Sequence, residues 1–297
     1  MDFSEALLNI AAEMNKWACI STEFNNSDSG DTNIVGITPN DIETKVYRYT
    51  TLSRLQQMIV DRENVLVKPE LWSDPFEKLL TNTDYLNVTY QNSNVITSEV
   101  TDNIYGQCWT MSNIERDYLW MLRANRNKDE VGVRIETTLR KLFLSLWLSL
   151  RKCANNQICD NCDDPCRAPI EAYIGRVDYK PKDSVKAYLE NMQFSDFLIP
   201  SGHGLAYLRF IKPVEFDYEE EVRLLYRHVK DSSQRLYLDA KLARYPIEPL
   251  DLINEVVIDP RLSDTEFQKE KSGLNRIGYT NVRHSDLYQM HKVSLQL

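Results

Sequence analysis

The chain has 297 residues, of which 42% are hydrophobic and 10% aromatic, as in globular proteins with one large or two ordinary domains. Its formal charge is −9, so long-range repulsion from phosphate backbones argues against a broad, non-specific nucleic-acid binder. No signal-peptide pattern is visible, and the most apolar stretch, residues 142–150, is too short to span a bilayer. We therefore expect a cytoplasmic protein without a membrane partner.

The N-terminal part of the chain is predicted to stand apart from the globular body. Residues 3–19 carry apolar side chains at helical spacing, which indicates an amphipathic helix within an N-terminal segment, 1–24. The polar run 25–33 has too few apolar residues to bury a face, and the linker that contains it is predicted to cover 25–44. The body then spans 45–297.

The body mixes short strands with helices. Strands are predicted at 46–50, 65–67, 105–111, 131–135, 172–179, 205–211, 216–226 and 255–258, and helices after Thr51 and at 115–125, 137–152, 184–192 and 265–275. Thr51 has the side chain of a helix N-cap, and the apolar stripe of 137–152 predicts core packing. Because there is no regular βαβ rhythm, an α+β fold is expected rather than a doubly wound sheet.

The predicted strand 216–226 contains three consecutive carboxylates. Because side chains alternate along a strand, Glu219 and Glu221 are expected on one face and Glu220 on the apolar face, either at a sheet edge or at a bulge. The simplest interpretation is a solvated acidic surface, since charged residues are usually exposed. Three basic residues could partly neutralise this surface: Lys212, Arg223 and Arg227.

Four of the six cysteines fall together in a loop, 151–169. Thiolates are good ligands for Zn²⁺, which takes four of them in a tetrahedron, and the loop has little apolar content to hold it otherwise. The interpretations are a structural zinc ion, free thiols and, less favoured, an iron–sulfur cluster, since a reducing compartment disfavours disulfides. The candidate ligands are Cys153, Cys159, Cys162 and Cys166.

Common hydrolase and nucleotide-triphosphatase patterns are missing from the sequence, because the four histidines are scattered and no phosphate-binding loop is visible. An ordered triple remains. Its three segments are Val46-Tyr-Arg-Tyr49, Trp109-Thr-Met-Ser112 and Glu219-Glu-Glu-Val222. This order resembles the Arg, Ser/Thr, Glu-x-Glu signature of mono-ADP-ribosyltransferases. The resemblance implies an ADP-ribosyltransferase-like split mixed sheet surrounded by helices, with NAD as substrate.

The resemblance also implies a role for each residue. Glu221 would stabilise the positive charge that develops on the ribose when the nicotinamide bond breaks, an effect of roughly 4 kcal/mol at about 4 Å and a dielectric near 20. Glu219 would position or deprotonate the acceptor, and Arg48 would hold the ribose or pyrophosphate. Thr110 and Ser112 would orient Glu221 and the substrate. Three aromatic residues could stack on the cofactor or pack in the core: Tyr47, Tyr49 and Trp109.

A broader series of segments is similar to an uncharacterised bacterial family whose members often lie near phage-defence genes. The series runs from Tyr47-Arg-Tyr49 through Ser73-Asp-Pro-Phe-Glu77, Cys108-Trp-Thr110 and Glu219-x-Glu-x-Arg223 to Val257-Ile-Asp-Pro260 and Arg283-His-Ser285. This similarity implies a toxin or effector that modifies RNA, DNA or protein, and an antitoxin or regulatory partner for it.

Two other functions fit the sequence. The first is a non-catalytic interaction or antitoxin-type protein that keeps the fold without the chemistry, which the acidic charge and the separate N-terminal helix favour. The second is a zinc-stabilised nucleic-acid binder centred on the cysteine loop.

Overall fold

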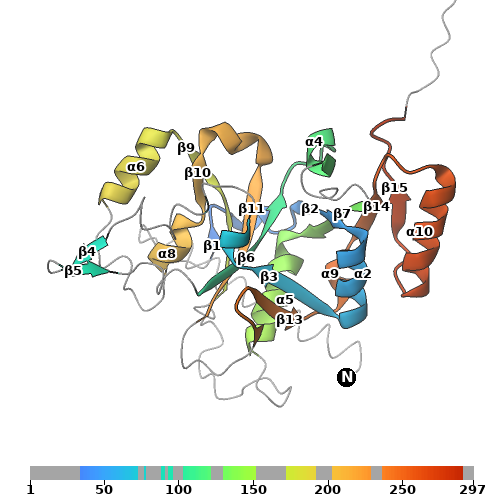
Figure 1. Ribbon diagram of the computed structural model, residues 1–297, viewed down its shortest axis with the longest axis horizontal. Coiled ribbons are helices and arrows are strands. Elements are labelled where there is room, and N and C mark those ends of the chain that lie inside the picture. Colours follow the sequence, from blue (N-terminus) through green and yellow to red (C-terminus); the bar gives the residue numbers. More distant parts are fainter. Residues whose placement is uncertain are drawn as a thin grey trace, which may run out of the picture.

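A computed structural model describes residues 34–72, 77, 88–90, 93–95, 103–121, 130–151, 172–191, 203–228 and 236–289 (Figure 1). The predicted N-terminal helix and the cysteine loop lie outside these residues. Within them the fold is α+β: a mixed central sheet with helices packed against it.

The central sheet has eleven strands. Its main path runs β1-β8-β11-β6-β2-β7-β14-β15, formed by Ile34–Val35, Ala172–Arg176, Glu221–Arg227, Ile104–Thr110, Lys45–Thr51, Gly132–Thr138, Glu255–Ile258 and Val282–His284. A branch leaves β6 through β3, Glu63–Val67, and continues to β13, Leu242–Pro246, and β12, Tyr237–Leu238. Two small ladders lie apart from this sheet: β9 with β10, Asp178–Lys180 and Ile211–Pro213, and β4 with β5, Val88–Tyr90 and Ser93–Val95.

The sheet forks at β6, because two different strands pair with its one edge. Thr110, at the end of β6, pairs with Tyr47 of β2, whereas Gly106 pairs with Val67 of β3. Helix α2, Leu52–Asp61, connects β2 to β3 and spans the fork (Figure 1). Its first turn is capped as the sequence predicts, with the Thr51 hydroxyl accepting from the Arg54 N–H.

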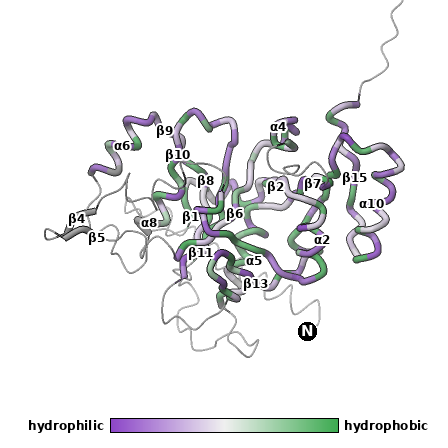
Figure 2. The backbone as a smooth tube through the Cα atoms, viewed as in Figure 1, coloured by the Kyte–Doolittle hydropathy of each residue, from purple (hydrophilic) through white to green (hydrophobic). Residues whose placement is uncertain are grey.

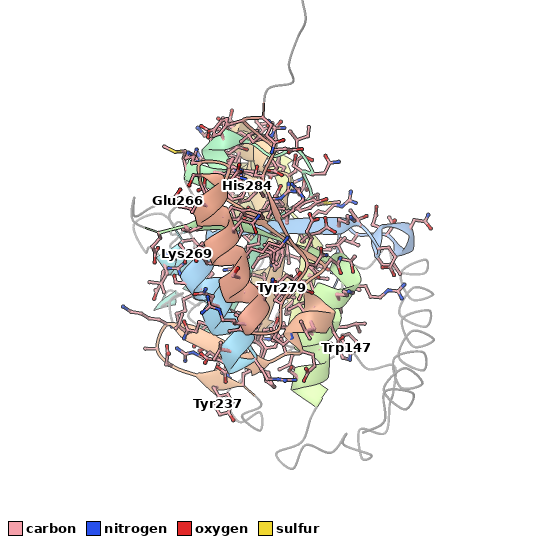
Figure 3. The ribbon with its side chains drawn as sticks, turned by 90° about the vertical axis from the view of Figure 1, so that its right-hand side faces the viewer. Trp147, Tyr237, Glu266, Lys269, Tyr279 and His284 are labelled. Atoms are coloured by element: carbon pink, nitrogen blue, oxygen red, sulfur yellow. The ribbon has the colours of Figure 1, made fainter. Side chains whose placement is uncertain are left out.

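One face of the sheet, which we call the core face, packs against α2, α5 and α10. Helix α5, Leu139–Arg151, buries its apolar stripe there, and α10, Asp264–Arg276, covers the β14–β15 end. Figure 2 shows hydrophobic residues concentrated along the central strands and α5. The capping box of Ser263 and Glu266 starts α10, and Phe267 of this helix stacks on His284 of β15 at 4.8 Å. Figure 3 shows Glu266 on α10 with His284 near it.

The opposite face is covered by shorter elements. Helix α8, His203–Leu208, contributes to a cluster over β6, β8 and β11, and α4, Asp117–Leu119, contributes to one over β2 and β14. Helix α6, Lys182–Asn191, lies beside β10, and α9, Pro249–Leu252, beside α5. Three short 3-10 turns complete the described elements: η1 at Pro39–Asp41, η2 at Pro69–Leu71 and η5 at Val214–Glu219.

Several predicted elements are confirmed, and others differ. The strand predicted at 172–179 is divided into β8 and β9, which belong to different sheets. The strand predicted at 205–211 is mostly helix α8, and the helix predicted at 115–125 is reduced to α4 within the residues that can be described. The strand predicted at 216–226 begins only at Glu221, after η5. Two residues of the expected linker, Ile34 and Val35, form β1, which pairs with β8 and buries Ile34.

Candidate functional site

The three segments that carry the resemblance meet on neighbouring strands. In the pairing register Glu221 of β11 lies opposite Thr110 of β6, and Thr110 lies opposite Tyr47 of β2. These three residues form one lateral row, the acid row, and project from the face opposite the core face, which we call the acid face. Positions 47, 110 and 221, far apart in the chain, therefore lie side by side at one end of the sheet.

The backbone just before the acid row breaks the expected strand alternation. Glu219 ends η5, and Glu220 has a left-handed conformation with φ of 43°. Strand β11 therefore starts only at Glu221. Glu219 and Glu221 nevertheless converge on one ammonium group: Lys212 Nζ lies 2.8 Å from the Glu219 carboxylate and 3.7 Å from that of Glu221. Glu220 points elsewhere, toward Arg116 at 3.8 Å.

Glu221 belongs to a buried group of charged side chains, the ion cluster, which consists of Glu77, Arg209, Lys212, Glu219, Glu221 and Arg223. Arg223 links two of its carboxylates, because its guanidinium lies 2.9 Å from Glu221 and forms a two-bond pair with Glu77. Arg209 donates to the Glu77 carbonyl at 2.8 Å. The cluster therefore balances three carboxylates with three cations.

Because the side chains of the ion cluster are shielded from water, each charge needs a neighbouring opposite charge to remain ionised. Glu221 is only 3% exposed and Arg223 only 1%, which corrects the expectation of a solvated acidic surface. Burial alone would lower the pKa of Arg223, but the carboxylates of Glu221 and Glu77 outweigh it and raise that pKa above its usual value. The Glu219 side chain, 14% exposed, is the acid that reaches toward solvent.

Two hydroxyl groups fix the backbone around the acids. Thr110 donates its hydroxyl to the Glu219 carbonyl at 2.7 Å, and the Tyr179 hydroxyl accepts from the Glu221 N–H at 2.9 Å. Burial raises the pKa of Tyr179, so this phenol stays neutral. The Ser112 N–H donates to the Thr110 hydroxyl at 3.1 Å. Thr110 thus holds the backbone of Glu219, and Ser112 in turn contacts the Thr110 hydroxyl. That these two residues orient the Glu221 carboxylate and the substrate stays a prediction.

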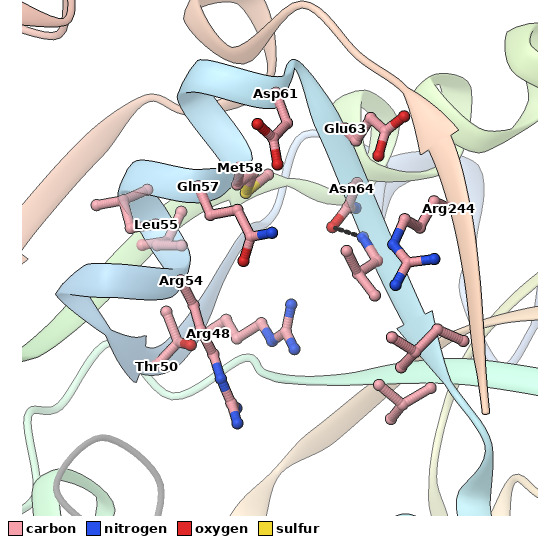
Figure 4. A pocket seen from close by; sticks show the side chains of 14 residues that line it. Arg48, Thr50, Arg54, Leu55, Gln57, Met58, Asp61, Glu63, Asn64 and Arg244 are labelled. Carbon is pink, nitrogen blue, oxygen red and sulfur yellow. Dashed lines mark hydrogen bonds between the residues drawn. The ribbon is translucent and has the colours of Figure 1, made fainter. Parts of the chain in front are cut away.

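Arg48 does not join the acid row. It follows Tyr47 in β2, so its side chain leaves the opposite face of the sheet, and it lines a cleft there beside α2 (Figure 4). Trp109 also lies on the core face, where its indole N–H donates to Gln107 at 3.2 Å. The expected single site with Arg48 and Glu221 side by side is therefore not assembled in this structure.

Tyr47 and Tyr49 remain on the acid face but are buried by packing. The guanidinium of Arg134 lies over the Tyr47 ring at 4.6 Å, and Tyr49 makes an edge contact with Trp120 at 5.0 Å. Burial raises the pKa of both tyrosines, and the Glu136 carboxylate adds to the effect on Tyr47.

A second set of paired charges, partly buried, lies farther along the acid face, and sequence reasoning missed it. Glu115 receives Arg134 at 3.3 Å and Arg283 at 3.1 Å, and the Ser285 hydroxyl donates to the same carboxylate. Arg283 also reaches Glu255 at 3.0 Å. Arg283 and Ser285 belong to one of the segments quoted for the broader similarity. That segment series was the available signal, since it also includes Glu77 and Arg223.

The cleft that Arg48 lines occupies the fork between β2, α2 and β3 and has a volume of about 270 Å³. Three arginines reach it from separate elements: Arg48, Arg54 and Arg244. Asp61 and Glu63 lie at its other end, where α2 passes into β3 (Figure 4).

The cysteine ligands proposed for zinc, Cys153 to Cys166, lie outside the described residues. Among the residues that are described, no three His, Cys, Asp or Glu side chains are grouped so as to hold a metal ion. Every helix in the same part of the chain is too short or too polar to cross a bilayer. In comparisons with known proteins, no family model, curated protein or solved structure matches the chain.

Proposed function

We propose that the protein is an NAD-dependent ADP-ribosyltransferase whose acids are Glu219 and Glu221. The acid row supports the proposal: the segments that resemble the transferase signature occupy three adjacent strands, with Tyr47, Thr110 and Glu221 in register. A chance resemblance among short motifs gives no reason for this convergence.

Transfer of ADP-ribose from NAD requires a carboxylate that is held in place beside the positive charge that develops on the ribose. When the nicotinamide–ribose bond breaks, its electron pair leaves with nicotinamide, and the anomeric carbon becomes cationic before the acceptor bonds to it. Glu221 suits this role because Arg223 and Lys212 hold its carboxylate from two sides, so little reorganisation is needed. Glu219, the more exposed acid, would take the proton that the acceptor loses.

In this proposal Arg48 does not take part in the reaction, because it lines the cleft on the other face of the sheet. The acceptor remains a macromolecule, as the resemblance implies. The cations next to Glu221 are Lys212 and Arg223, both buried. An effector role in defence against phage, with RNA, DNA or protein as acceptor, follows from the family similarity alone.

The test is transfer of label from NAD in a cell lysate, followed by separate nuclease and protease digestion of the product. Glu221→Gln should reduce labelling by roughly a thousandfold, the effect expected for losing one charge near the reacting centre. Glu219→Gln should reduce it less. Glu220→Gln is the matched control, since Glu220 lies between the two acids and points to Arg116 instead.

Each variant needs a thermal melt, because Glu221→Gln also removes a charge from the ion cluster. Full labelling by a folded Glu221→Gln protein would refute the catalytic assignment. Equal losses in Glu219→Gln and Glu220→Gln would instead point to a general effect on the fold.

The second candidate is a non-catalytic binding protein. The observation that favours it is the burial of Glu221 together with its pairing on both sides, which equally suits a structural role. This candidate requires that the wild-type protein neither bind NAD, as measured by calorimetry, nor label any lysate component. Its partner would be recovered as a stable complex.

A further inference from the structure

The cleft at the fork of the sheet has walls of two chemical kinds. Six apolar side chains from four elements line it: Leu55, Met58, Val65, Val67, Ile135 and Leu242. The remaining lining residues are polar or charged, including the three arginines and two carboxylates described above. A ligand that fits must present both an apolar surface and charged or hydroxyl groups.

Two of the arginines stand apart from the carboxylates in the cleft. Arg48 and Arg54 extend together into one part of the cavity, whereas Asp61 and Glu63 stand at the α2–β3 end (Figure 4). Arg244, from β13, lies on the Asn64 side and pairs with Asp239 at 3.0 Å. Guanidinium groups bind phosphate through paired, charge-assisted hydrogen bonds. Carboxylates accept hydrogen bonds from hydroxyl and amino groups.

The β3 wall of the cleft is held by a network of buried hydrogen bonds. Asn64, which lines the cleft, donates to the Tyr245 hydroxyl at 2.7 Å and accepts from Gln107 at 2.5 Å. Tyr245 in turn lies 3.1 Å from the Ser145 hydroxyl of α5. A polar wall whose groups are satisfied by one another is a rigid surface for a ligand.

We propose that this cleft binds a nucleoside monophosphate, with the phosphate held by Arg48 and Arg54 and the base against the apolar wall. Asp61 and Glu63 would accept hydrogen bonds from ribose hydroxyls or from an exocyclic amino group. A volume of about 270 Å³ lies just below the range of roughly 300–1,000 Å³ that encloses drug-sized ligands, which suits one nucleotide rather than a dinucleotide.

This site is separate from the acid row. Arg48 and Tyr47 are neighbours in β2 and leave opposite faces of the sheet, so a ligand in the cleft does not reach Glu221. The proposed nucleotide site and the proposed transferase acids therefore lie on opposite faces of the sheet.

The test is calorimetric titration of the full chain with AMP, adenosine, ribose 5-phosphate and inorganic phosphate. AMP should bind most tightly, because adenosine lacks the phosphate and the other two lack the base. Arg48→Gln and Arg54→Gln should each weaken AMP binding at least tenfold. Arg62→Gln is the control, since Arg62 follows the same helix but pairs with Glu248 outside the cleft.

Three outcomes would overturn the proposal: no AMP binding at millimolar concentration, equal affinity for AMP and adenosine, or unchanged AMP affinity in both cleft variants. Binding of inorganic phosphate as tight as that of AMP would overturn the nucleoside part. The Glu221→Gln protein serves as a further control and should bind AMP like wild type, whatever the labelling experiment shows.

Discussion

Arg223 is the side chain on which the ion cluster depends, because it is buried and joins Glu221 of its own strand to Glu77 of a distant segment. Replacing it by Leu would leave Glu77 and Glu221 buried without that partner. Removing one member of a buried ion pair typically costs about 3–5 kcal/mol. Arg223→Leu should therefore lower the free energy of unfolding by this amount in urea titrations, whereas the exposed Arg276→Leu should change it by less than about 0.5 kcal/mol.

A double variant separates pairing from packing. Arg223→Leu with Glu77→Leu removes both charges of one pair, so it should recover part of the stability lost in Arg223→Leu alone. Losses that simply add would show that Glu77 and Arg223 do not depend on each other.

Asp41 gives a pH-dependent contribution to stability. Its carboxylate accepts from the Thr38 hydroxyl at 2.7 Å and from the Thr38 N–H at 2.9 Å, and Arg176 lies 2.8 Å away. These contacts lower the pKa of Asp41 below its usual value of 3.8. The folded protein thus gains stability from ionised Asp41 above about pH 4, and loses it as the pH falls through the folded-state pKa.

The predicted comparison is the unfolding free energy of wild type and Asp41→Asn between pH 3 and 7. The stability advantage of wild type should be constant above about pH 5 and shrink toward pH 3. An advantage that is the same at every pH would contradict the assignment to this carboxylate.

Prediction of the site from the sequence failed where a shift of one residue along a strand decides which face of the sheet a side chain occupies. Arg48 and Tyr47 differ by one position, yet one lines the fork cleft and the other the acid row. A propensity pattern cannot decide which of two neighbours faces which side when both faces of the strand carry polar groups. The burial of Glu221 likewise depends on Lys212 from another segment, and on Arg223, which Glu77 holds from a third.

At the level of elements, the fork in the sheet depends on Gly106. A Cβ at this position would lie 2.5 Å from a Leu225 methyl carbon and 3.0 Å from the Trp72 ring. Gly106→Ala should therefore lower the free energy of unfolding by about 1–3 kcal/mol, through displacement of these side chains. Gly273→Ala in α10 is the control, since its nearest neighbour is 3.8 Å away and Ala favours a helix by up to about 1 kcal/mol.

If Gly106→Ala matched wild type in urea unfolding, the close approach of β11 and η2 to β6 would be wrong. If Gly273→Ala also lost stability, the comparison would say nothing specific about the fork.

Elements with strong, uninterrupted patterns were predictable, and those shaped by tertiary contacts were not. The stripe of α5 and the apolar run of β14 appear at nearly the expected positions, because each buries its own residues on the core face. The apolar alternation before Glu221 suggested a strand, but the left-handed Glu220 ends η5 and resets the register. The expected strand at 205–211 became α8, whose buried side chains Ala206 and Leu208 pack on β8 and β11.

At the scale of the whole molecule, the boundary of the folded unit lies before residue 45. Ile34 and Ile37 are each 3% exposed, and the backbone of Ile42 and Thr44 accepts hydrogen bonds from the start of α5. Burying two isoleucine side chains contributes about 3–6 kcal/mol as an upper estimate. A chain beginning at 45 should thus be several kcal/mol less stable than one beginning at 34.

Chemical denaturation of the two shortened chains measures this difference, and an Ile34→Ala/Ile37→Ala variant of the full chain should reproduce most of it. Equal stability of the two shortened chains would restore the interpretation of 25–44 as a linker. The expected loss would instead show that β1 stabilises the sheet. Strand β1 pairs with β8, and β8 pairs with β11, which carries Glu221.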